Sequence, residues 1–132
     1  MTKAPSDAAV NFLLAESVRQ EAGGKLTLIG FYPGNQLLIP KGTKQTITPL
    51  AFIFLVLEGE GTFLTAISLV SPSGKAMFQD EKMPDSVKIP KQPLSVLVGV
   101  QPFVTDEIGK FDVTLRLGDA SYRRSFIVDF AP

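Results

Sequence analysis

Short apolar segments separated by turn residues recur along the whole chain, and this pattern restricts the fold more than any other feature. The segments are six to ten residues long and rich in Val, Ile, Leu, Phe and Thr, and clusters of Gly, Pro, Ser and Asp separate them. Such spacing is typical of an all-β chain, and no helical period competes with it. It predicts strands at about 9–19, 25–32, 50–58, 62–70, 94–101, 110–117 and 122–130, with short strands near 36–39 and 86–89.

This strand pattern predicts one domain over residues 1–132, of which residues 1–8 are expected to form a flexible N-terminal tail. About seven to nine short strands without intervening helices favour an antiparallel two-sheet sandwich of immunoglobulin-like or Greek-key type. Two hairpins have clear turn signals. "SPSGK" places Pro72 and Gly74 where a type I turn needs them, and "LGDAS" supplies Gly118 and Asp119.

Composition removes many function classes. The chain has no histidine and no cysteine, so Ser-His-Asp and Cys-His catalysis, disulfides and the usual zinc, haem and iron–sulfur ligand sets are excluded. The 13 basic and 13 acidic residues are scattered, so the sequence predicts no nucleic-acid partner. The longest apolar run, Leu50–Leu57, has eight residues, against about 20 for a spanning helix. We therefore expect no membrane partner. Asp7 and Asn11 interrupt the N-terminal apolar stretch, which is then too short for a secretory signal, so we expect a cytoplasmic chain.

Carboxylates are the one remaining group for catalysis or cation binding. The candidate clusters in predicted loops are Glu58 with Glu60, Asp80 with Glu81 and Asp85, and Asp106 with Glu107. A pair could do acid–base work, and loops at one end of a sandwich could gather carboxylates around calcium. Each cluster lies beside Lys or Gly, where a solvated carboxylate is the commoner state, so a carboxylate-based enzyme and a calcium-dependent sandwich are kept only as alternatives.

The segment "EAGGK" connects two predicted strands and has the length of a hairpin loop. Gly23 and Gly24 can both adopt positive φ, as a tight primed turn requires. Glu21 and Lys25 would then flank the turn on facing strands and attract each other weakly. Arg19 precedes the turn, and its planar guanidinium could anchor a carboxylate or a partner surface.

The stretch "AESVRQEAGGKLTLIGFYPG", followed by a proline near the next strand and a late "GKFDVTLRL" hairpin, carries a resemblance. It resembles a family of uncharacterised bacterial proteins that begin with an acidic residue, Val-Arg, a glycine turn and Lys-Leu-x-Leu-x-Gly-x-Tyr. The likeness is most specific over residues 15–34. It implies a β-sandwich with no assigned activity and no catalytic residue, and it draws attention to Arg19, Gly24, Lys25, Gly30 and Tyr32.

Residues 50–57, "LAFIFLVL", are apolar on both faces of the predicted strand. One face of a strand in a two-layer sandwich should meet water, so the second apolar face must be covered by the chain itself or by an interface. The segment "TKQTITPL" and the loop from Met77 to Pro93 are long enough to provide such a cover. The other possibility is a homodimer through this sheet.

These observations favour a non-catalytic protein-binding or assembly module without a cofactor or metal. Its partner is an unidentified protein or a second copy of the chain. The residues that we expect to contribute to the interaction are Arg19, Glu21, Lys25, Tyr32, Ile53, Leu55 and Leu57.

Overall fold

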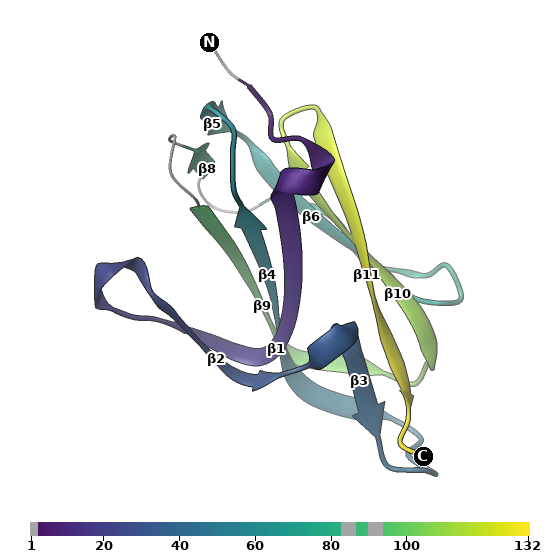
Figure 1. The fold of residues 1–132 in the computed structure, drawn as a ribbon. Coiled ribbons are helices and arrows are strands. Elements are labelled where there is room, and N and C mark those ends of the chain that lie inside the picture. Colours follow the sequence, from purple (N-terminus) through teal and green to yellow (C-terminus); the bar gives the residue numbers. More distant parts are fainter. Residues whose placement is uncertain (1–2, 83–86, 90–93) are drawn as a thin grey trace.

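Two sheets face each other and enclose the core of an all-β sandwich (Figure 1). The computed structural model describes residues 3–82, 87–89 and 94–132. One sheet has the strand order β2-β1-β4-β9, the other has the order β3-β11-β10-β6-β7, and β5 pairs with β8 in a small separate sheet. The strands are β1 (Val10–Gln20), β2 (Leu26–Phe31), β3 (Gln36–Ile39), β4 (Thr46–Val56), β5 (Gly61–Phe63), β6 (Thr65–Val70), β7 (Ala76–Lys82), β8 (Val87–Ile89), β9 (Leu94–Thr105), β10 (Gly109–Leu117) and β11 (Ala120–Phe130).

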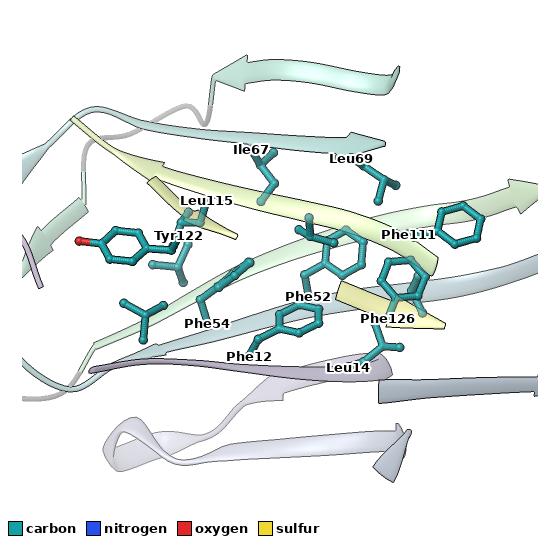
Figure 2. Close-up of a cluster of buried hydrophobic side chains, with 14 of the residues drawn as sticks. Phe12, Leu14, Phe52, Phe54, Ile67, Leu69, Phe111, Leu115, Tyr122 and Phe126 are labelled. Atoms are coloured by element: carbon teal, nitrogen blue, oxygen red, sulfur yellow. The ribbon is translucent and has the colours of Figure 1, made fainter. Parts of the chain in front are cut away.

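Phenylalanine side chains fill the centre of the core (Figure 2). Phe111 and Phe126, on paired strands, stack with ring centroids 5.1 Å apart. Phe103 of β9 contacts both rings edge-on, and Phe52 of β4 lies 5.6 Å from Phe126. These contacts join the two sheets, and aromatic pairs of this kind add about 0.5–1.5 kcal/mol each beyond the area they bury.

Both hairpins with clear turn signals are confirmed. The N–H of Gly74 donates to the carbonyl of Ser71 over 2.9 Å, which places Pro72 at the second position of the turn between β6 and β7. Gly74 has φ +89°. At the second hairpin Leu117 pairs with Ala120, so Gly118 and Asp119 form the two-residue turn between β10 and β11.

The structure differs from the predicted strands at several places. The predicted strand 62–70 is divided into β5 and β6, which belong to different sheets. β3 runs parallel to β11, so the expectation of a wholly antiparallel sandwich is wrong for this pair. β7 is a strand that pairs with β6, although its charged sequence was expected to be loop. β4 begins before Pro49, and its register with β9 shifts between Thr48 and Leu50, which is where a sheet tolerates proline. Of the expected loop from Met77 to Pro93, residues 83–86 and 90–93 lie outside the described residues.

The segment before β1, expected to be a flexible tail, contacts the sandwich from Lys3 onward. The hydroxyl of Tyr122 donates to the carbonyl of Pro5 over 2.6 Å, and this bond is buried. The guanidinium of Arg124 lies 3.0 Å from the carboxylate of Asp7 and also donates to its carbonyl. Lys3 forms a backbone bridge with Glu60. These bonds fix the chain direction at the start of β1.

Candidate functional site

The second half of β1 separates from β4 and pairs with β2. Residues from Val10 to Ala15 pair with β4, whereas the residues from Ser17 to Gln20 pair with β2. The resulting hairpin, residues 16–31, is called the arm below. It extends to the left from the lower end of β1 in Figure 1. Most of the residues that the sequence indicated as an interaction site lie on this arm or at its base.

The turn of the arm confirms the predicted hairpin but is longer than a two-residue turn. The N–H of Glu21 donates to the carbonyl of Lys25 over 2.7 Å, so three residues lie between them. Gly23 and Gly24 have φ +83° and +79°, a conformation that costs side-chain-bearing residues energy. The prediction of two glycines with positive φ is therefore confirmed, and the tight two-residue loop is wrong.

Glu21 interacts with Arg19 and Thr27 at the tip of the arm. Its carboxylate lies 3.9 Å from Nε of Arg19 and accepts a hydrogen bond of 3.2 Å from the Thr27 hydroxyl. Arg19 and Lys25 are exposed, and an exposed ion pair of this type contributes about 0–1 kcal/mol. The tip thus displays two cations and a carboxylate whose own interactions are weak enough to be exchanged for those of a partner.

One face of the arm is apolar and packs on the sheet. Its partly buried side chains Val18, Leu26 and Leu28 contact a second, smaller core formed by Ala15, Ala51 and Ile53. The second apolar face of β4 is therefore covered by the chain itself, and the cover is the arm. The described residues of the two segments that were expected to provide the cover contribute to the strands β4, β7 and β8.

The predicted interaction residues of β4 do not share one surface. Ile53 is fully buried beneath the arm, Leu55 is partly buried at the edge of the same cluster, and Leu57 lies after the end of β4 with 47% of its surface exposed. Among these three residues, Leu57 alone is accessible to a partner to any large extent. A homodimer through this face of β4 would require the arm to move away.

Small residues make room for the arm on the outer face of the sheet. Ala15 of β1 pairs with Ala51 of β4, and Ala51 pairs with Gly99 of β9, so the three form one row across the sheet. Both alanines are buried, whereas Gly99 is exposed and a Cβ added there would meet nothing within 4 Å. The arm therefore covers the row as far as Ala51 and stops before β9.

The backbone changes its hydrogen-bonding phase at Gly30. Toward the tip, the residues that form backbone hydrogen bonds between the two strands of the arm have odd numbers, as in the bond from Glu21 N–H to Lys25 O. At the base, Tyr32 N–H donates to Leu14 O over 2.9 Å, so the bonded residues have even numbers. In a regular antiparallel ladder the phase is constant. The change falls where Gly30 adopts φ +64°, and it aligns the even-numbered apolar residues of the arm with the odd-numbered apolar residues of the sheet.

Tyr32 lies at the base of the arm and packs against the main core. Burial raises the pKa of its phenol above the ordinary value, the charge of Glu16 raises it further, and a hydrogen bond with the Thr48 side chain lowers it. The neighbouring Glu16 lies over Gly30, because a Cβ at residue 30 would be 2.6 Å from Cδ of Glu16. This arrangement fixes the junction between arm and sandwich, so Tyr32 contributes to the orientation of the arm.

The outer edge of β2 is open, since β2 is the last strand of its sheet. Two apolar side chains beside this edge are exposed, Ile29 by 44% and Phe31 by 46%. Neither was among the residues that the sequence indicated. The signal was present in "LTLIGF", where Thr27, Ile29 and Phe31 alternate with the two leucines that face the sheet, but alternation alone does not tell which strands lie at an edge.

Two of the candidate loop carboxylates, Glu58 and Glu107, accept hydrogen bonds from neighbouring segments. Glu58 accepts a hydrogen bond of 2.8 Å from the Ser6 hydroxyl. Glu107 accepts one of 2.8 Å from the Ser73 backbone N–H, and hydrogen bonds from Ser71 and Ser73 lower its pKa. Within residues 3–82, 87–89 and 94–132, no group of three or more acidic side chains could hold a metal ion. Of the proposed calcium cluster, Asp85 and the side chains of Asp80 and Glu81 lie outside the described part.

No helix in the described part of the chain has the length and apolar character needed to span a membrane. Comparison with known proteins finds no family model and no curated protein that matches this sequence. The resemblance of residues 15–34 to a bacterial family therefore stays a prediction.

Proposed function

We propose that this domain is a non-catalytic protein-binding or assembly module and that it acts through the open edge of β2. The observation that carries the proposal is the combination of an unpaired strand edge with two exposed apolar side chains, Ile29 and Phe31. An exposed edge of this kind is a template for another strand. Addition of an extended segment to such an edge is a common way for β domains to bind proteins.

The other edges of the two large sheets have features that oppose strand addition. β3 has four residues and lies between Pro33 and Pro40. β7 has two register irregularities and three charged residues in its sequence. β9 contains Pro102, which has no N–H to donate. β2 contains neither proline nor a charged residue, so it is the edge with the least protection.

The arm also offers the two kinds of contact that a strand-adding partner uses. The main-chain groups of the edge provide hydrogen bonds that do not depend on the partner's sequence, whereas the exposed side chains select alternate residues of the partner. Arg19 and Lys25 at the tip extend this apolar strip with a polar rim. A partner segment is therefore expected to be extended, apolar at alternating positions, and acidic or neutral where it reaches the tip.

Docking of the arm on the sheet favours binding. Val18, Leu26 and Leu28 fix its inner face against the sandwich, so the open edge is held in one orientation before a partner arrives. Preorganisation of this type reduces the entropy cost of association. A carboxylate enzyme and a calcium-dependent sandwich have less support, because the described carboxylates Glu58 and Glu107 accept hydrogen bonds from Ser6 and Ser73 of neighbouring segments.

Site-specific photocrosslinking tests the proposal. Phe31 is replaced by the photoreactive residue benzoylphenylalanine in cells that produce the protein, and irradiation is expected to yield a discrete crosslinked product. Leu38 is the matched control position, since it is 51% exposed on the edge strand β3 of the other sheet. The product should be lost when Ile29→Lys is added. Equal crosslinking from both positions, or a product that is insensitive to Ile29→Lys, would overturn the proposal.

A further inference from the structure

We infer that the strand which occupies the edge of β2 is β2 of a second copy of this chain, paired antiparallel about a two-fold axis at Thr27. The inference rests on the proposed function, because it names the partner of the same edge. It follows from which backbone groups of β2 point outward and from how those groups repeat along the strand.

The hydrogen bond from Glu21 to Lys25 fixes the bonding pattern of the arm. Bonded and non-bonded pairs alternate along an antiparallel ladder, so the bonded pairs next to it are Arg19 with Thr27 and Ser17 with Ile29. Thr27 and Ile29 therefore direct their backbone groups toward β1. The backbone groups of Leu26 and Leu28, which alternate with them, point to the open edge.

The outward groups belong to Leu26 and Leu28, and they are placed symmetrically about Thr27. In antiparallel pairing of two β2 strands about this residue, Leu26 of one copy faces Leu28 of the other, and Leu28 faces Leu26. Each N–H on one edge then meets a carbonyl on the other edge. The interface is isologous, as expected for a two-fold dimer, and the two four-stranded sheets become one continuous sheet.

The side chains beside the edge are compatible with this register. Ile29 of one copy faces Lys25 of the other, so the aliphatic stem of the lysine covers the exposed isoleucine while its ammonium group stays in water. The two Lys25 side chains lie at opposite ends of the paired segment. Thr27 faces Thr27, a pair that sheets accept. No like charges face each other along β2, and the formal net charge of the chain is zero.

The partner copy is preferred over an unrelated segment because β2 itself has the properties that the edge requires. Its segment Leu26–Phe31 is extended, uncharged and apolar at alternating positions. The hydrogen-bonding phase that exposes Leu26 and Leu28 in one copy exposes the same groups in the other. The hydrogen-bonding groups of two such open, uncharged edges are complementary to each other, and a second copy of the chain is always present in solution. Pairing of β2 with its own copy is therefore favoured.

Single cysteines test this register directly, because the natural chain has none. At the two-fold axis, the Cβ atoms of residue 27 face each other in a non-hydrogen-bonded pair, where they are about 4.5–5.5 Å apart, close to disulfide geometry. Thr27→Cys is therefore expected to give a disulfide-linked dimer under mild oxidation. Ile29→Cys is not, since the two residues would be roughly 13 Å apart along the strands. Leu38→Cys on β3 is the control for random collision.

Sedimentation velocity of the full chain supplies the second measurement. The wild type is expected to be a dimer that Ile29→Lys converts to a monomer, because the new charge would face Lys25 of the other copy, whereas Leu38→Lys stays dimeric. Thr27 and Ile29 are exposed, so the variants should retain the circular dichroism of the wild type. A wild type that is monomeric at about 100 μM, or stronger disulfide formation at residue 29 than at residue 27, would overturn the inference. The photocrosslink at Phe31 to a different protein would then still support the proposed function.

Discussion

Replacing Ala51 by leucine would test whether the arm rests on the outer face of β4. Ala51 is buried beneath Val18, Leu26 and Leu28, and a leucine adds three heavy atoms to this closed contact. Overpacking of a tight site costs about 1–3 kcal/mol. The expected result is a folded protein whose free energy of unfolding is lower by this amount and whose arm is less firmly docked.

Whether the arm stays docked depends on the overpacking cost relative to the stabilisation that the arm gains from burial of its side chains. Complete burial of a Val or Leu side chain contributes about 1.5–3 kcal/mol, and the three side chains of the arm are only partly buried, so about 3–6 kcal/mol is a reasonable total for them. Because this exceeds the expected cost of overpacking, Ala51→Leu should leave the arm docked in most molecules. The population of open arms should rise by about 5- to 150-fold, since 1.4 kcal/mol corresponds to tenfold.

Hydrogen exchange read by mass spectrometry measures this change. Amides of residues 17–29 should exchange faster in Ala51→Leu, while those of β10 and β11 change only as far as global stability falls. Gly99→Ala is the matched control in the same row of the sheet, because its new Cβ meets nothing within 4 Å. This variant should leave the exchange of the arm unchanged and stabilise the strand by about 0.5–1 kcal/mol. Unchanged exchange of the arm in Ala51→Leu would refute its seating on β4.

Two further predictions concern other parts of the fold. Tyr122→Phe removes the buried hydrogen bond to the carbonyl of Pro5 and should cost about 1–3 kcal/mol, with earlier protease cleavage before β1 than in the wild type; equal cleavage would contradict this role. Glu107→Gln should flatten the loss of stability in acid, because hydrogen bonds from Ser71 and Ser73 lower the pKa of Glu107. In the wild type this stabilisation is fully present above the unfolded pKa, near 4.5, and is lost as the pH falls through the lower folded pKa. The urea midpoints at pH 6 and pH 3 should therefore differ less in the variant than in the wild type.

Features determined by residues close in sequence could be predicted. The turn at Ser71–Lys75 forms because proline presets φ at one position and Gly74 accepts positive φ at another. The alternation of β10 predicts its buried face, and Phe111, Val113 and Leu115 are indeed all fully buried. In each case one short segment contains all of the determinants.

Features that depend on distant segments could not be predicted in this way. β7 has the sequence "AMFQDEK", whose charges favour a loop, and it becomes a strand because β6 provides a hydrogen-bonding edge beside it. The chain passes from one sheet to the other after Tyr32, and β3 then pairs in parallel with β11, the last strand of the chain. Tertiary context decides strand formation more strongly than local preference does.

The arm shows how a local signal can be read correctly and its consequence still missed. The apolar residues on both faces of β4 correctly indicated a covered sheet, yet the covering residues are recognisable only once Gly30 is known to shift the hydrogen-bonding phase. That same shift turns Leu26 and Leu28 toward the sheet and leaves Ile29 exposed beside the open edge. The burial of one side of the hairpin and the availability of the other are therefore consequences of one backbone feature. A variant that abolishes the phase change should disturb docking and strand pairing together, whereas a change at Ile29 should affect pairing alone.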